Sequence, residues 1–207
     1  MMISPESFYE MELKGKTVPE LRATLFRLRT EIGKMHSIME GKCPTDEMID
    51  PSPLVRLLCI REYFAVTVRA LKEQGFIYKP TSQEKRTSEL YAAMDDVKSI
   101  DFQIRGFHSG YRTATLSIHP ETKIITLNGV EQSEDDSDNI MYLLQQLYLP
   151  EWKREYTDPS ILDGIQWKLI VTFHGEVKPF AVSGSNAYPH NFDELLEIMG
   201  IDKKAIA

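Results

Sequence analysis

The spacing of apolar residues changes near residue 98, and this change restricts the chain to a helical part followed by a sheet. Before this point apolar side chains recur every three or four residues, the spacing of one face of an α-helix. After it they alternate with polar residues, as in a β-strand with one buried face. The pattern predicts an α+β fold with a helical region over 1–97 and a sheet domain over 98–207.

The helical region is expected to form an antiparallel pair of helices. The first is predicted over 17–41, where Thr17 and Glu20 have the spacing of a capping box. The second is predicted over 52–75 and begins with a Ser-Pro pair, which is typical of a helix start. The heptad spacing of the first helix would also suit a dimer, but its partner across one short loop favours an intramolecular pair.

The sheet domain is expected to contain a mainly antiparallel sheet of about five strands packed with helices. Three strands are predicted as a meander between residues 100 and 127, and two more as a hairpin over 167–182. Leucines at helical spacing predict a helix over 140–149. A last short helix is predicted after Asn191, with Asn191 as its cap and Glu194 completing a capping box.

The charge of the chain is concentrated in its second half. The net charge is −7, of which −1 falls on residues 1–97 and −6 on residues 98–207. Because broad nucleic-acid binding requires Lys and Arg to neutralise phosphates, this balance argues against it. The sequence shows no apolar run of membrane-spanning length and no signal-peptide pattern at its acidic start, so we expect a cytoplasmic protein without membrane contact.

The sequence lacks the motifs of the large cofactor-using classes. It has no Gly-rich loop followed by Lys-Ser/Thr, no paired Cys or His-Glu-x-x-His spacing, and no Gly-x-Ser-x-Gly elbow. We therefore expect no cofactor and no metal.

An acidic run between a predicted strand and a predicted helix is the first candidate binding site. It could imitate a phosphate backbone toward a basic partner. It would equally suit a solvated segment whose later acids favour the helix N-terminus. The run consists of Glu131, Glu134, Asp135, Asp136 and Asp138.

Two further polar sets are candidate sites. His108, with Arg105, Tyr111 and Arg112 close by in the sequence, could supply a general base and charge stabilisation for RNA cleavage without a metal. The same residues also suit a polar hairpin tip. A second set could converge as a pocket at one end of the sheet, although turn formation and packing explain it as well. This set consists of Asp163, Asn186, Tyr188 and His190.

Three segments resemble a pattern in uncharacterised bacterial proteins that are often found on phages, plasmids and other mobile elements. These segments read KGKTVPELRATLFRLRTEIGKM, LDGIQW and SGSNAYPHNFDELL. The resemblance assigns no catalytic residues. It implies a context, because small proteins of mobile elements often block host defence and CRISPR effectors are frequent targets.

From charge, missing motifs and this context we expect a macromolecule-binding inhibitor or adaptor, such as an anti-CRISPR protein. Its expected partner is a protein or ribonucleoprotein effector of the host, in which RNA can take part in the contact. The alternative is a metal-independent nuclease or RNA-processing enzyme that uses the residues around His108.

Overall fold

The computed structural model describes residues 2–41, 51–106, 110–161, 163–202 and 204. These residues form two compact units, 1–80 and 81–207, and each is described by itself. The sequence placed the division at 97/98, whereas the structure places it at 80/81. The helix that precedes the sheet therefore belongs to the sheet unit.

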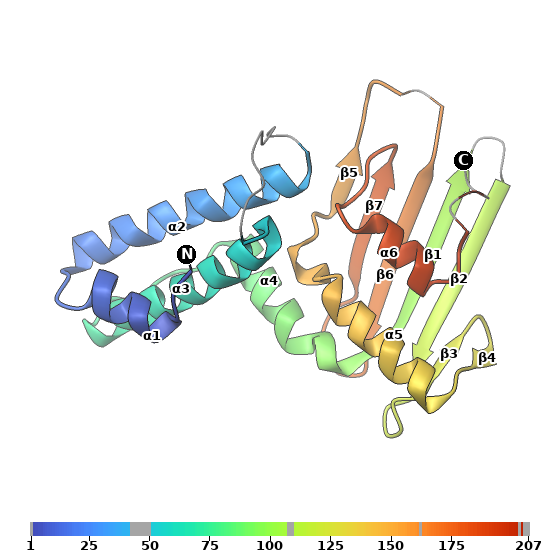
Figure 1. Cartoon of the computed structure of the whole chain (residues 1–207), viewed down its shortest axis with the longest axis horizontal. Coiled ribbons are helices and arrows are strands. Elements are labelled where there is room, and N and C mark those ends of the chain that lie inside the picture. Colours follow the sequence, from blue (N-terminus) through green and yellow to red (C-terminus); the bar gives the residue numbers. More distant parts are fainter. Residues whose placement is uncertain (1, 42–50, 107–109, 162, 203, 205–207) are drawn as a thin grey trace. The chain divides into compact units, whose positions relative to one another are not determined.

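The first unit is an antiparallel helical hairpin, as the apolar spacing predicted, and it is preceded by a short N-terminal helix that the spacing did not predict (Figure 1). The Glu20 carboxylate accepts a hydrogen bond of 2.8 Å from the Thr17 backbone N–H, which confirms the predicted helix start. None of the described helices is both long enough and apolar enough to cross a membrane. The elements are α1 Pro5–Phe8, the π-helical η1 Tyr9–Leu13, α2 Val18–Met39 and α3 Pro53–Glu73.

The N-terminal segment of this unit is fixed to α3 by one tyrosine. The rings of Phe8 and Tyr63 stack with centroids 4.2 Å apart. The Tyr63 hydroxyl donates to the Ile3 carbonyl at 2.6 Å and accepts from the Ile3 N–H at 2.9 Å. These contacts complete a core made mainly by α2 and α3, in which Leu21 and Leu57 are fully buried.

The second unit is a seven-stranded sheet in the order β4-β3-β2-β1-β6-β7-β5, with helices on one face (Figure 1). All described strand pairs are antiparallel except β5 with β7, which is parallel. In chain order the elements are α4 Ser82–Ala93, η2 Met94–Asp96, β1 Val97–Gly106, β2 Gly110–Ile118, β3 Ile125–Leu127, β4 Val130–Glu131, α5 Glu134–Gln146, η3 Leu149–Glu151, β5 Glu155–Thr157, β6 Gln166–Phe173, β7 Phe180–Ser185 and α6 Phe192–Ile198.

The expected count of about five strands is therefore too low. The two additional strands are β4 and β5, which have two and three residues. Segments of this length are too short to display an alternating pattern, so periodicity does not reveal them. Both lie at the edges of the sheet, where short strands are common.

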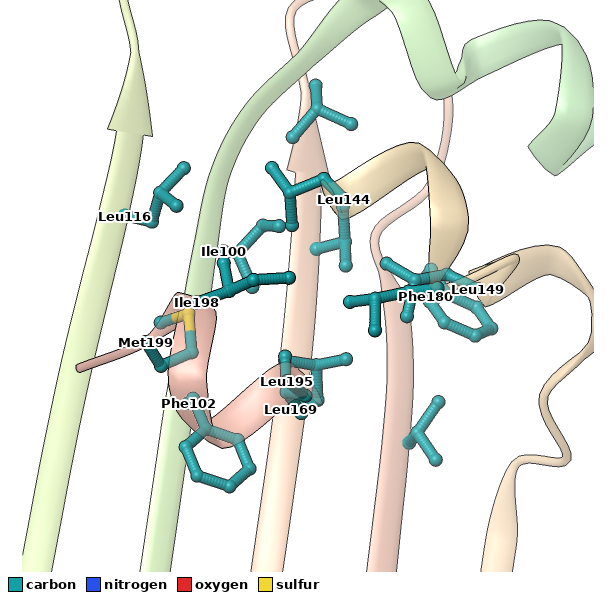
Figure 2. Packing of buried hydrophobic residues seen from close by; sticks show 14 of the residues in the cluster. Ile100, Phe102, Leu116, Leu144, Leu149, Leu169, Phe180, Leu195, Ile198 and Met199 are labelled. Atoms are coloured by element: carbon teal, nitrogen blue, oxygen red, sulfur yellow. The ribbon is translucent and has the colours of Figure 1, made fainter. Parts of the chain in front are cut away.

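Alternation along the central strands gives the sheet one apolar and one polar face. Ile100, Phe102 and Ile104 of β1 are buried, whereas the residues between them are more exposed. Their partners on β6 are Val171, Leu169 and Trp167. Figure 2 shows Leu144, Leu149 and Leu195 of the helical layer packed near this face.

An aromatic cluster lies at one end of this core. The ring centroids of Trp152 and Trp167 are 6.3 Å apart, and Phe192 approaches Trp167 to 4.8 Å. Gly184, directly opposite Trp167 on β7, leaves room for the indole. A Cβ atom built on Gly184 would lie 2.1 Å from Trp167 Nε1, so no larger residue fits without a shift of the indole.

We predict that Gly184→Ala lowers the free energy of unfolding of the sheet unit by about 1–3 kcal/mol, the usual effect of overpacking a filled core. Gly175→Ala is the control, because a Cβ atom there meets no atom within 4 Å. Urea denaturation followed by circular dichroism measures both variants. Equal stability of the two would contradict the packing described here.

Candidate functional site

The structure separates the residues of the predicted catalytic set. Arg105 and Tyr111 are direct partners in the β1–β2 register, so they share the polar face of the sheet. Arg112 is opposite Ile104 and therefore belongs to the other face. His108 lies outside the described residues. Of the three expected residues that the structure describes, it brings Arg105 and Tyr111 together.

Arg105 and Tyr111 line a shallow hollow of about 350 Å³ on the polar sheet face. The Tyr111 hydroxyl donates to Gln103 Oε1 at 3.2 Å, and 65% of the Tyr111 surface is exposed. Lys168 and Glu155 also line the hollow, so its charge is mixed. This face offers polar contacts of both signs and no single dominant charge.

Asn186, from the predicted pocket set, holds the chain connection before β6. Its side-chain oxygen accepts from the Ile165 N–H at 2.8 Å, and its side-chain nitrogen donates to the Ile161 carbonyl at 3.1 Å. Its φ of 56° lies in the left-handed region, which Asn adopts more readily than most residues. Both polar atoms of this side chain are thus used within the fold.

The other members of that set are Asp163, Tyr188 and His190. The Tyr188 ring packs on Phe192 with centroids 4.7 Å apart. Burial raises the pKa of the Tyr188 hydroxyl. Asp163 and His190 are exposed. The contacts of Asn186 and Tyr188 thus favour structural roles for both residues.

The predicted cap at Asn191 is wrong. No side-chain hydrogen bond from Asn191 caps α6. Instead the buried Asn191 amide donates to the Leu147 carbonyl at 2.8 Å, and Trp152 Nε1 donates to the same oxygen at 3.1 Å. The side chain therefore links the start of α6 to the end of α5, a contact between distant parts of the sequence.

The acidic run lies mostly on the first turns of α5, where all its members are exposed. Ser133 caps the helix by accepting from the Asp136 N–H at 3.1 Å. Glu134, Asp135 and Asp136 occupy the first turn, where negative charge complements the helix dipole. Glu131 belongs to β4, opposite Thr126.

A second group of carboxylates, which the sequence reading missed, lies on the neighbouring helix α6. Asp193, Glu194 and Glu197 are exposed, and α6 packs against α5. Neither helix contains a Lys or Arg. The absence of Lys and Arg from both helices was the signal in the sequence that could have revealed this second group. We call the combined set the acidic surface: Glu131, Glu134, Asp135, Asp136, Asp138, Asp193, Glu194 and Glu197.

Among the residues that the structure describes, no group of three or more His, Cys, Asp or Glu side chains is placed to hold a metal ion. Exposed carboxylates such as those of the acidic surface attract positive charge.

We predict that Asn186→Gly lowers the free energy of unfolding by about 1–2 kcal/mol, because it removes both hydrogen bonds but tolerates the left-handed backbone. Asn186→Ala should cost about 1 kcal/mol more, because alanine is strained there. Asn139→Ala, on the exposed side of α5, is the control and should change stability little. If Asn186→Gly had the stability of the wild type in urea denaturation, this result would contradict a structural role for Asn186.

No protein-family model, no curated protein and no solved structure matches this chain. The functional assignment therefore depends on the residues and their geometry.

Proposed function

We propose that this chain is a macromolecule-binding inhibitor or adaptor that docks its acidic surface on a basic, nucleic-acid-binding partner. The observation that carries the proposal is the charge of two adjacent helices. α5 and α6 together present seven exposed carboxylates and no Lys or Arg. A solvated helix face usually mixes both signs of charge.

Helix stability explains only part of this charge. Acids in the first turn stabilise a helix, and Glu134, Asp135 and Asp136 are placed there. Asp138 and Glu197 lie beyond the first turns of α5 and α6, where the dipole effect has faded. Like charges that bring no local benefit are typical of a surface used for recognition.

The charge of the whole unit supports the same proposal. Residues 81–207 contain 12 Lys and Arg against 20 Asp and Glu, a net charge of −8, whereas residues 1–80 have a net charge of +1. Such a field attracts a positively charged partner and speeds its association. Tyr142 on α5, with 59% of its surface exposed, adds an aromatic side chain of the kind enriched in interfaces.

The resemblance to proteins of mobile elements suggests which partner to test. A CRISPR effector binds its guide RNA and target DNA in a basic channel, and an acidic surface could occupy that channel in place of nucleic acid. We therefore propose anti-defence inhibition as the role of the acidic surface, with a guide-loaded effector as the partner.

The rival assignment as a nuclease has less geometric support. It requires His108, which lies outside the described residues, to act with Arg105, Tyr111 and Arg112. The strand register puts Arg112 on the opposite sheet face from Arg105 and Tyr111. Binding through the helical layer does not depend on that set.

We predict that the triple variant Glu131→Lys, Asp138→Lys, Glu197→Lys weakens binding to a guide-loaded CRISPR effector at least about tenfold, because it reverses charge on the acidic surface. These three positions lie outside the first helical turns, so the helix dipoles are spared. Affinity is measured on immobilised chain against a panel of purified effectors, and inhibition of target-DNA cleavage is measured in parallel.

The matched control is Glu121→Lys, Glu155→Lys, Asp163→Lys, which changes the net charge by the same amount at exposed positions elsewhere in the unit. It should retain wild-type affinity. Equal weakening of both variants would show that only net charge matters, and would contradict a defined acidic surface. Failure of every effector to bind would remove the anti-CRISPR assignment.

A further inference from the structure

A basic groove lies in the sheet unit beside α4, in contrast to the acidic charge of the unit as a whole. It has a volume of about 580 Å³, which is in the range of small-molecule sites. Its walls come from α4, the segment before β5 and the connection between β6 and β7. The charged residues that line it are Lys85, Arg86, Arg154, Lys178, Glu89 and Glu176.

Arg86 is the central residue of this groove. Its guanidinium carbon lies 4.8 Å from the centre of the Phe180 ring, so the side chain is laid over the apolar end of β7. Its Nη2 atom is buried and has no hydrogen-bond partner among the described residues. A guanidinium nitrogen withdrawn from water without an acceptor costs free energy.

Arg154 acts on Arg86 with a charge of the same sign. Burial lowers the pKa of the Arg86 guanidinium, and the positive charge of Arg154 lowers it further. Like charges repel, and an anion placed between two arginines offsets that repulsion. The residues of the groove thus leave positive charge that a ligand can neutralise.

The groove is built on fixed elements. The Tyr91 hydroxyl of α4 donates to the Glu151 carboxylate at 2.8 Å, and Glu151 is only 8% exposed. A capping box of Thr81 and Glu84 defines the start of α4, with hydrogen bonds of 2.7 and 3.2 Å. Lys85 and Arg86 follow as the fourth and fifth residues of that helix.

From this arrangement we infer that the groove binds the phosphate group of a small phosphate ester about the size of a nucleotide. Four cations against two carboxylates leave a charge of +2 among the lining residues, which matches a phosphate monoester dianion. Arginine forks pair with phosphate oxygens in bidentate geometry. Leu90, Val177 and Pro179 provide apolar wall for the body of the ester.

This site is independent of the acidic surface, because it attracts the opposite charge through different residues. Loss of one activity therefore leaves the other measurable. A chain that fails to bind any CRISPR effector would still be expected to bind the ester.

The test uses the full chain and titrates adenosine monophosphate, inorganic phosphate and adenosine by calorimetry. We expect saturable one-to-one binding of the monophosphate, inorganic phosphate weaker by at least about tenfold, and no binding of adenosine. Adenosine as tight as the monophosphate would overturn recognition of the anion. Inorganic phosphate as tight as the monophosphate would overturn the assignment to an ester.

Two variants assign the binding to the groove. Arg86→Gln and Arg154→Gln should each weaken binding of the monophosphate at least about tenfold, because each removes one guanidinium charge. Arg112→Gln, at an exposed arginine on β2, is the matched control and should bind like wild type. Arg154 is exposed, so its variant should fold even if the Arg86 variant does not. Wild-type affinity of Arg154→Gln, or no saturable binding to the unaltered chain, would overturn the inference.

Discussion

The register of β1 between β2 and β6 is the constraint on which the sheet unit depends. Because side chains alternate between faces, a shift of one residue would move Phe102 from the core to water. The paired register puts Phe102 beside Ala114 and Leu169, all of them buried. This arrangement leaves only one face apolar, so α4, α5 and α6 all have to cover that face.

The placement of α4, α5 and α6 in one layer has an electrostatic consequence. The acidic surface of α5 and α6 and the basic groove beside α4 belong to the same helical layer, while the sheet face on the other side has mixed charge. The unit thus sorts its charged groups into separate regions, although its net charge alone suggests a uniformly acidic protein.

The sequence predicted those elements whose own residues carry a recognisable local pattern. The capping box at Thr17, the helical hairpin and the β6–β7 hairpin follow from nearby residues, and the structure confirms them. Short edge strands and long-range bonds carry no local signal. Asn191 illustrates this limit, because its amide bonds to Leu147, 44 residues earlier, instead of to its own helix.

The same distinction between local and long-range signals applies to the candidate sites. The acidic run was visible in the sequence because its members lie within eight residues of one another, whereas the carboxylates of α6 were not predicted as part of a site, and only Glu194 had an expected role, in a capping box. The basic groove combines Arg86, Arg154 and Lys178, which only folding brings together. Arg105 and Arg112 looked equivalent until the strand register assigned them to opposite faces.

The aromatic cluster around Trp167 also determines what a fluorescence experiment can detect. The chain has two tryptophans, Trp152 and Trp167, and both lie in this cluster within the sheet unit. Emission excited at tryptophan wavelengths therefore reports on the sheet unit. The helical hairpin has no tryptophan, so its melting is not detected directly by this emission. The tyrosines of the hairpin, among them Tyr63, would need separate excitation or an introduced tryptophan before the two units could be compared.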